Sequence, residues 1–127
     1  MSIITDYAPI VGESTLEELS LLADRLKGRA IQNINSTAVG GGVAEILLRM
    51  LPLLQAMGVN ARWDVIRGDE RFFVVTKKMH NALHGVAADF APGDLDHFLE
   101  VNRQNARDIL SGADVVFIHD PQPIALV

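Results

Sequence analysis

Residues 29–45, with the sequence RAIQNINSTAVGGGVAE, decide the fold of the chain. The first seven residues are too few for a helix, and apolar side chains alternate with polar ones among them, which is typical of a β-strand. Three consecutive glycines follow at Gly40, Gly41 and Gly42, and from Val43 onward apolar residues recur at helical spacing. The stretch therefore predicts a strand, a glycine turn and a helix in direct succession.

The helix predicted after the glycine turn carries one broad apolar face and ends before Gly58, a natural terminator. Pro52 lies inside this helix, and because proline removes the backbone hydrogen bond to Leu48, we expect a kink there. The apolar face consists of Ile46, Leu47, Met50, Leu51, Leu54 and Met57.

An earlier helix is predicted over residues 15–27. Residues 14–17, Ser-Thr-Leu-Glu, match a capping box, in which the serine hydroxyl and the glutamate carboxylate satisfy free backbone N–H groups at a helix start. Gly28 is placed to end this helix. Its apolar residues at helical spacing are Leu16, Leu19, Leu22, Ala23 and Leu26.

The second half of the chain predicts a strand and then two helices. Residues 61–67 favour the strand. A helix over residues 70–83 follows, with Asp69 as its N-cap and Phe72, Phe73, Thr76, Met79 and Leu83 on its apolar face. Asp94 is expected to cap a further helix that runs through Leu110 and is ended by Gly112.

The last predicted strand covers residues 113–118, an apolar run of the kind buried on both faces of a parallel sheet. The alternation of helices and strands indicates an α/β fold with right-handed crossovers and a parallel sheet, in one domain over residues 1–127. No helix is predicted after the last strand, so we expect one face of the sheet to be incompletely covered.

Composition excludes several classes of function. The 127 residues include no cysteine, which excludes disulfide scaffolds, cysteine zinc sites and thiol nucleophiles. Eleven Lys and Arg residues stand against 16 Asp and Glu residues, for a net charge of -5 without a basic cluster, so no nucleic-acid partner is expected. The sequence has no apolar run long enough to span a bilayer and no signal-peptide pattern, which predicts a cytoplasmic protein without a membrane partner.

The glycine turn is the first candidate binding site, because ligands of open α/β sheets lie outside the carboxyl ends of the strands. Gly40, Gly41 and Gly42 let the backbone approach a ligand, and the helix start offers free N–H groups to a phosphate or sugar oxygen. Glu45 could accept hydrogen bonds from sugar hydroxyls. The spacing matches neither the dinucleotide fingerprint nor a P-loop, and a turn without a ligand is the alternative.

The second candidate site is the segment after the last strand. His119 and Asp120 stand at the strand's carboxyl end, and Pro121 and Pro123 fix the backbone around them. This pattern indicates a rigid polar corner suited to binding hydroxyl groups; a capping turn formed by Asp120 is the alternative. A catalytic triad with Ser36 is disfavoured, since neighbouring residues of one strand point to opposite sides.

Two further pairs of polar residues lie on predicted helices. His80 and His84 are four residues apart, which is metal-ligand spacing, but no acidic residue completes the set and no metal site is expected. Asn102 and Asn105 lie near the apolar side of the last helix. Each is expected to bond a neighbouring backbone group.

Five stretches together resemble the N-terminal part of the trehalose synthase group of retaining glycosyltransferases, the family-4 enzymes that join a nucleotide-activated glucose to glucose. The matching stretches are residues 7–11 (YAPIV), 35–45 (NSTAVGGGVAE), 61–68 (ARWDVIRG), 73–84 (FVVTKKMHNALH) and 118–123 (IHDPQP). They extend over nearly the whole chain in order, and the motifs are long enough to be specific to this group.

This resemblance implies two Rossmann-like domains that face a cleft, the GT-B fold. The N-terminal domain would hold the acceptor sugar, and the C-terminal domain the nucleoside-diphosphate glucose, with no cofactor and no metal. Gly40, Gly41 and Gly42 would approach the donor phosphates, and His119 and Asp120 would be the catalytic residues. The residues implied near the acceptor glucose or the transferred sugar are Glu45, His80, Asn81, His119, Asp120 and Gln122.

Two hypotheses follow from this resemblance. In the first, the chain is an incomplete N-terminal glycosyltransferase domain that is inactive without the donor-binding domain. In the second, it is a stand-alone module that binds sugar or associates with itself as a homo-oligomer. A receiver domain is disfavoured, because the first strand ends in Asn33 and Asn35 where a phospho-acceptor site needs paired carboxylates.

Overall fold

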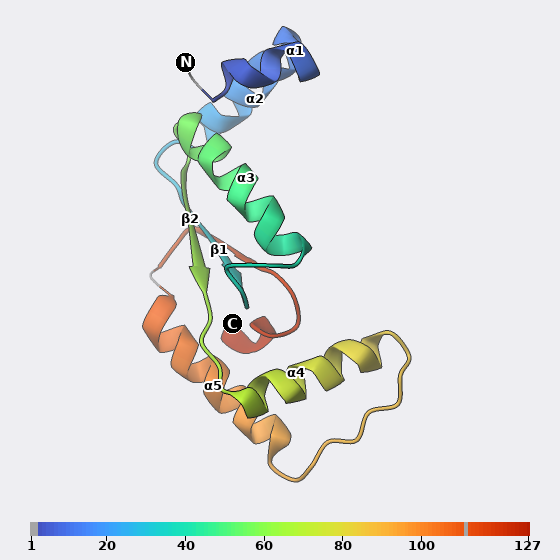
Figure 1. The fold of residues 1–127 in the computed structure, drawn as a ribbon. Helices are drawn as coiled ribbons and strands as arrows, with labels where there is room; N and C mark the ends of the chain where they lie inside the picture. Colours follow the sequence, from blue (N-terminus) through green and yellow to red (C-terminus); the bar gives the residue numbers. More distant parts are fainter. Residues whose placement is uncertain (1–2, 111) are drawn as a thin grey trace. The chain divides into compact units, whose positions relative to one another are not determined.

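The computed structural model describes residues 3–110 and 112–127, and it confirms the predicted α/β class (Figure 1). The three strands form one parallel sheet in the order β2-β1-β3, so β1 is the central strand. The elements in chain order are η1 (Thr5–Tyr7), α1 (Ala8–Val11), α2 (Glu13–Arg25), β1 (Ala30–Asn35), α3 (Gly42–Ala56), β2 (Asn60–Val65), α4 (Glu70–Leu83), α5 (Asp94–Ile109), β3 (Val115–Ile118) and η2 (Ile124–Leu126).

The chain divides into two compact units. The first unit contains η1, α1, α2 and α3 with the first residues of each strand. The second unit contains α4, α5 and η2 with the residues at the carboxyl end of each strand. Among the residues that the structure describes, no helix is long and apolar enough to cross a membrane.

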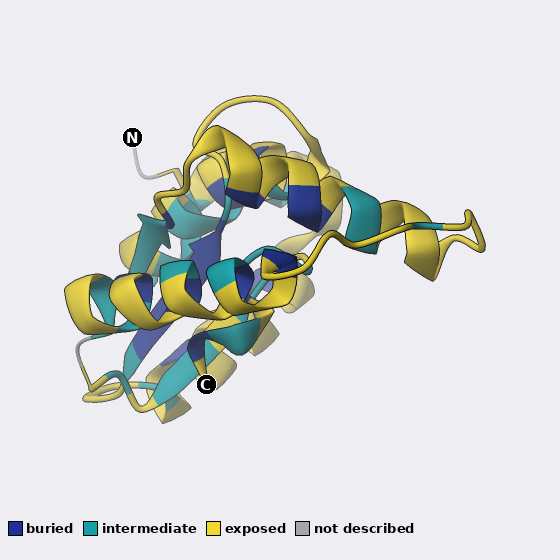
Figure 2. Ribbon diagram, turned by 90° about the horizontal axis from the view of Figure 1, so that it is seen from below, coloured by how far each residue is buried: buried dark blue, intermediate teal, exposed yellow. Residues whose placement is uncertain are grey.

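Apolar packing holds the first unit together. Its core is formed by Ala23, Ile31, Val59 and Ala61, with Leu26, Leu51, Leu54, Met57 and Val115 packed against it. Helices α2 and α3 each combine buried residues with exposed ones, and Figure 2 shows helices coloured both dark blue and yellow. Helix α3 runs through Pro52 as one element, and the kink stays a prediction.

The predicted capping box at residues 14–17 is wrong. Helix α2 begins at Glu13, and the residue before it is Gly12, whose positive φ of 84° lets the chain turn from α1 into α2. Ser14 therefore lies inside the first turn, and no side chain caps the helix. The helix starts early because residues 8–11 already form a helix that ends at this glycine.

The observed burial of β1 and β3 is the opposite of what their amino-acid composition predicts. Strand β1 is buried from Ile31 to Asn35 despite its amide side chains, because it lies between the other two strands. Strand β3 spans only Val115–Ile118, and Phe117 is 50% exposed. The prediction that residues 113–118 are buried on both faces is wrong, because this strand lies at an edge of the sheet.

Two aromatic rings pack the helices of the second unit. The rings of Phe72 in α4 and Phe98 in α5 are stacked, with centroids 5.9 Å apart and planes at 5°. Gly68 lies against the same phenylalanine, because a Cβ added there would be 2.4 Å from Cδ1 of Phe72. Figure 1 shows the long loop that connects α4 and α5 extending away from both helices.

The structure confirms the predicted N-cap of α4 and contradicts that of α5. Helix α4 covers Glu70–Leu83 as predicted, and Asp69 caps it by accepting a hydrogen bond from the Phe72 N–H at 2.8 Å. The N-cap of α5 is Gly93, so the prediction that Asp94 caps this helix is wrong. The Asp94 carboxylate lies one residue inside and accepts a bond from the Ala91 N–H at 2.9 Å.

The end of α5 also differs from its prediction. The helix ends at Ile109, and Leu110 already has extended backbone angles. Gly112 has a positive φ of 69° but follows the helix end by three residues. The glycine therefore shapes the connection to β3 and does not terminate the helix.

Candidate site at the carboxyl ends of the strands

The sheet order creates a switch point beside β1. Strands β2 and β3 lie on opposite sides of β1, and in such sheets ligands bind outside the carboxyl ends at this point. The pairing continues past the ends of the strands: the His119 N–H donates to the Ile34 carbonyl at 2.9 Å, and the Ile66 N–H donates to the Asn35 carbonyl at 3.0 Å. These bonds fix where the chain leaves each strand.

Residues 119–122, here named the strand-end corner, follow β3 in the second unit. Asp120 has a φ of 69° and is the one non-glycine residue with a positive φ in the described part of the chain. Aspartate tolerates this left-handed conformation better than most residues, and such positions cluster at functional sites. Asp120 is also the residue for which the resemblance implies a catalytic role, and that role stays a prediction.

Two buried oxygens near the corner lack donors. In the part of the chain that the structure describes, Oδ1 of Asn102 and Oε1 of Gln122 are buried without a hydrogen-bond partner. A buried acceptor left unpaired costs about 1–3 kcal/mol.

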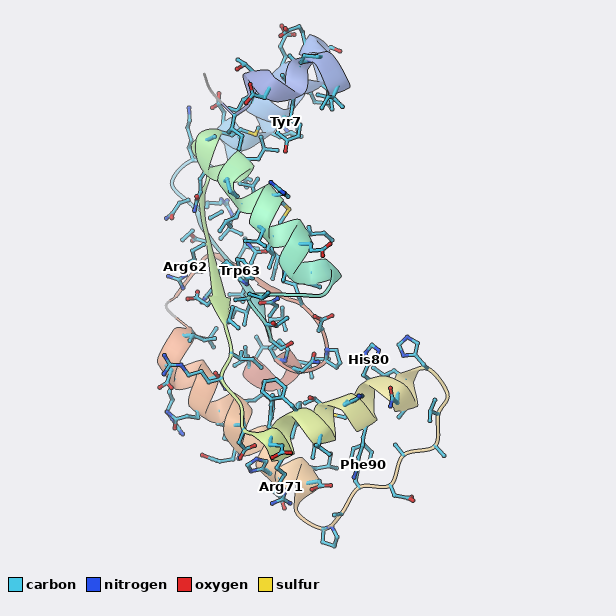
Figure 3. All side chains as sticks on the ribbon, viewed as in Figure 1. Tyr7, Arg62, Trp63, Arg71, His80 and Phe90 are labelled. Carbon is cyan, nitrogen blue, oxygen red and sulfur yellow. The ribbon has the colours of Figure 1, made fainter. Side chains whose placement is uncertain are left out.

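His80 and Asn81 occupy the last turns of α4, also in the second unit. Both are exposed, and their side chains form no hydrogen bond with the other described residues. Figure 3 shows His80 pointing to one side of α4 and Phe90 lying on the opposite side. The structure therefore does not tie these two predicted site residues to the strand-end corner.

The histidine pair has part of the geometry of a metal site. The rings of His80 and His84 have centroids 4.5 Å apart, and Nδ1 of His84 lies 2.8 Å from the His80 carbonyl oxygen. No group of three or more side chains able to hold a metal occurs among residues 3–110 and 112–127. Ser36 makes no side-chain hydrogen bond to His119 within the same residues, so no triad is assembled.

The glycine turn and Glu45 belong to the first unit. Gly40 and Gly41 have φ values of 75° and 83°, and Gly42 is the first residue of α3. No heavy atom lies within 4 Å of a Cβ added at any of the three. Their glycine character therefore serves the backbone conformation at Gly40 and Gly41 and leaves the loop open on its outer side.

Glu45 lines a groove of about 1090 Å³ along α3. Tyr7 and Arg49 line the same groove, and neither was predicted as a site residue. Glu45 and Arg49 are four residues apart on one helix, a spacing that could have signalled a shared face. The other lining residues are Gly42, Ile46, Leu48, Met50 and Leu53.

A second polar cluster surrounds the start of α4. Nε2 of His97 lies 2.8 Å from Oδ1 of Asp69, and this hydrogen bond, together with that from the Phe72 N–H, holds the pKa of Asp69 below its usual value. The Ala91 N–H and then the Arg71 guanidinium lower the pKa of the Asp94 carboxyl in the same way. Sequence reasoning missed both contacts to side chains, because they join residues more than 20 positions apart.

The side-chain amide of Asn105 forms hydrogen bonds with the backbone that follows β2. Nδ2 of Asn105 donates to the Arg67 carbonyl at 2.7 Å, and its Oδ1 accepts from the Arg67 N–H at the same distance. Nδ2 also donates to the Val101 carbonyl at 2.8 Å. The neighbouring backbone bond predicted for Asn105 is confirmed, while the two bonds to a residue 38 positions away were not predicted.

Comparison with known proteins adds the family. Trehalose synthase of Pyrococcus horikoshii is 46% identical over 98% of this chain, and that of Thermococcus litoralis is 44% identical over the same share. Trehalose phosphorylase of Pleurotus pulmonarius is 31% identical over 98% of the chain. The chain spans 30% and 31% of the two synthases and 18% of the phosphorylase.

A family model agrees with these relatives. The model described as "Trehalose synthase, N-terminal domain" matches residues 33–127, which begin inside the central strand and include the glycine turn and the strand-end corner. With this match over most of its length, the chain belongs to the family of trehalose synthase N-terminal domains.

Proposed function

We propose that the chain is the acceptor-side part of a retaining, GT-B-type glycosyltransferase. The enzyme would transfer glucose from a nucleoside-diphosphate glucose to a second glucose and form trehalose. The observation that carries this proposal is that both synthases and phosphorylases of trehalose match 98% of the chain. The names of the two kinds of enzyme have only trehalose in common. We therefore infer that the segment shared by both kinds recognises a sugar.

The strand-end corner supplies suitable chemistry for an acceptor glucose. Asp120 and His119 would orient the attacking hydroxyl, and the Gln122 side chain would contact a neighbouring hydroxyl. Selection follows because a sugar with a misplaced hydroxyl leaves a buried polar group unpaired, at a cost of about 1–3 kcal/mol. His80 and Asn81 would contact the sugar from α4.

The glycine turn would serve the donor. Gly40 and Gly41 precede the 15-residue helix α3 and Gly42 begins it, and the free N–H groups at this helix start favour negative charge. Glu45 would contact the transferred sugar. Transfer also requires stabilisation of the leaving diphosphate, and the resemblance assigns the groups that do this to the second domain. We therefore expect no glycosyl transfer by the chain alone.

An NMR titration tests the sugar site directly. The ¹⁵N-labelled chain is titrated with trehalose and glucose, with galactose as a control that differs at one hydroxyl. We expect saturable shifts at residues 119–122 for the first two sugars, and weaker shifts for galactose and for Asp120→Asn. Absence of saturable shifts, or equal shifts with all three sugars, would contradict the proposal.

Self-association is the second candidate function. Ile46 and Leu48 on α3 are 60% and 54% exposed, and exposed apolar side chains favour contact with another protein surface. A homo-oligomer would bury at least one of these side chains. Native mass measurement over a range of concentrations tests this, and Ile46→Ser should shift the mass toward the monomer.

A further inference from the structure

Helix α5 carries two buried asparagines one turn apart. Asn102 is 0% exposed and Asn105 is 4% exposed. Each donates from Nδ2 to the carbonyl four residues earlier, Phe98 at 3.0 Å and Val101 at 2.8 Å. Each also bonds the backbone of a segment that follows a strand: Asn105 bonds Arg67 after β2, and Asn102 bonds the Gln122 carbonyl at 3.1 Å after β3.

The two side chains differ in how completely they are paired. Oδ1 of Asn105 accepts a hydrogen bond from the Arg67 N–H, so both polar atoms of this side chain bond the backbone. Asn102 uses its nitrogen alone, and its buried Oδ1 has no partner among the described residues. Asn102 therefore keeps a free acceptor beside the strand-end corner, where Oε1 of Gln122 is in the same condition.

Asp120 lies between two backbone anchors. On one side the His119 N–H donates to the Ile34 carbonyl, and on the other the Gln122 carbonyl accepts from Asn102. The Asp120 side chain makes no hydrogen bond within the described part of the chain, so its left-handed backbone is not held by its own carboxylate. Pro121 also lies between the anchors, and its ring fixes its own φ and restricts the conformation of Asp120 before it.

We propose that Asn102 is a positioning residue of the sugar site. Its amide would hold the Gln122 carbonyl and thereby keep Asp120 in the left-handed conformation in which it meets the sugar. The role in sugar binding rests on the proposed function, whereas the effect on the backbone of Asp120 does not.

Matched variants of the two asparagines separate positioning from packing. Asn102→Leu and Asn105→Leu each replace a buried amide with an apolar side chain of similar size on the same helix. Asn102→Ser is the milder second variant, because a serine hydroxyl still reaches the Phe98 carbonyl four residues earlier but is too short for Gln122. Circular dichroism and thermal melting establish that each variant is folded.

The readout is the three-bond H–N–Cα–H coupling of Asp120, which reports its φ angle, followed by a trehalose titration. We expect both Asn102 variants to change this coupling and to weaken trehalose binding about tenfold, the factor that corresponds to about 1.4 kcal/mol. Asn105→Leu should lower the melting temperature comparably and leave both readouts near those of the unsubstituted chain.

Two results would overturn the positioning role. One is an unchanged Asp120 coupling in Asn102→Leu and Asn102→Ser, and the other is an equal change in Asn105→Leu. If Asn102→Leu does not fold, Asn102→Ser decides by the same criteria. If the unsubstituted chain binds no trehalose, the proposed function and the sugar-binding role of Asn102 fail, while the Asp120 coupling still decides whether Asn102 holds the corner.

Discussion

The two compact units of the chain are held together in different ways. Seven polar residues are buried in the described chain: Gln32 and Asn33 belong to the first unit, and Asn35, Thr76, Asp94, Asn102 and Asn105 belong to the second. The first unit has an apolar cluster at its core. The second adds side-chain bonds to the backbone where its strands end.

This difference relates structure to function. Apolar contacts are non-directional, so the first unit can hold its helices against the sheet without fixing the orientation of polar groups. Hydrogen bonds from buried amides are directional and costly to leave unpaired, so they fix one backbone geometry. Three of the five buried amides, those of Asn35, Asn102 and Asn105, lie in the unit that contains the strand-end corner, and each donates to backbone there.

The largest expected effect comes from the aromatic pair of the second unit. Phe72→Ala should lower the free energy of unfolding by about 4 kcal/mol, because it leaves a cavity against Phe98. Phe73→Ala is the control, since this neighbouring side chain is 39% exposed. Urea unfolding measures both, and a loss for Phe73→Ala equal to that for Phe72→Ala would contradict the packing described.

Removing an amide clamp should have the next largest effect. Asn105→Ala is expected to cost about 2 kcal/mol, because it leaves the N–H and the carbonyl of Arg67 without partners. In the first unit, Gln55→Ala removes a bond of 2.9 Å to the Ala61 carbonyl from an exposed residue and should cost less than about 1 kcal/mol. Equal losses of stability in the two variants would contradict the stronger contribution of buried amides in the second unit.

Acid should open the second unit first. The pKa of Asp69 and of Asp94 is lower in the folded chain than its ordinary value of 3.8. Their stabilisation is therefore present above that pH and is lost as the pH falls through the lower folded values. Hydrogen exchange below pH 4 should show faster opening of α4 and α5 than of α3.

Neutral variants provide the control for this pH dependence. Asp69→Asn and Asp94→Asn should each make the exchange of α4 and α5 less dependent on pH in this range, because one titrating group is removed. Faster opening of α3 than of α5 in acid would show that other carboxylates control the acid response.

The smallest expected effect on stability is at the corner. Asp120→Asn should change the free energy of unfolding by less than about 0.5 kcal/mol, because asparagine also tolerates a positive φ. Asp120→Ala should cost about 1 kcal/mol for the same backbone reason. In a complete enzyme containing this chain, both variants should abolish trehalose formation; normal turnover with a large loss of stability would make Asp120 a structural residue.

Local signals in the sequence predicted the elements near them well. Helix α4 has its predicted bounds, because the Asp69 cap and the first apolar residue lie within four positions of each other. The glycine turn and the start of α3 also match within one residue. The capping box at residues 14–17 failed because Gly12, two residues earlier, offered a sharper break between two helices.

Burial was harder to predict than helices and strands. The most apolar strand, β3, lies at an edge, and the strand with three buried amides, β1, lies in the centre. Composition could not predict this, because strand order depends on which segments pair across the sheet. The bond from Asn105 to Arg67 is equally non-local, and no pattern within α5 indicates its partner.

The sequence by itself determined the α/β class, the glycine turn, the family and the position of His119 and Asp120 after a strand, because these follow from local spacing and motifs. Only the tertiary structure decided which strand is central, that Asp120 is left-handed, and that Asn102 and Asn105 hold the segments after two strands. The physical reason is that a buried amide needs a hydrogen-bond partner. For Asn102 and Asn105 that partner lies 20 or more residues away in the sequence, so only folding brings the two together.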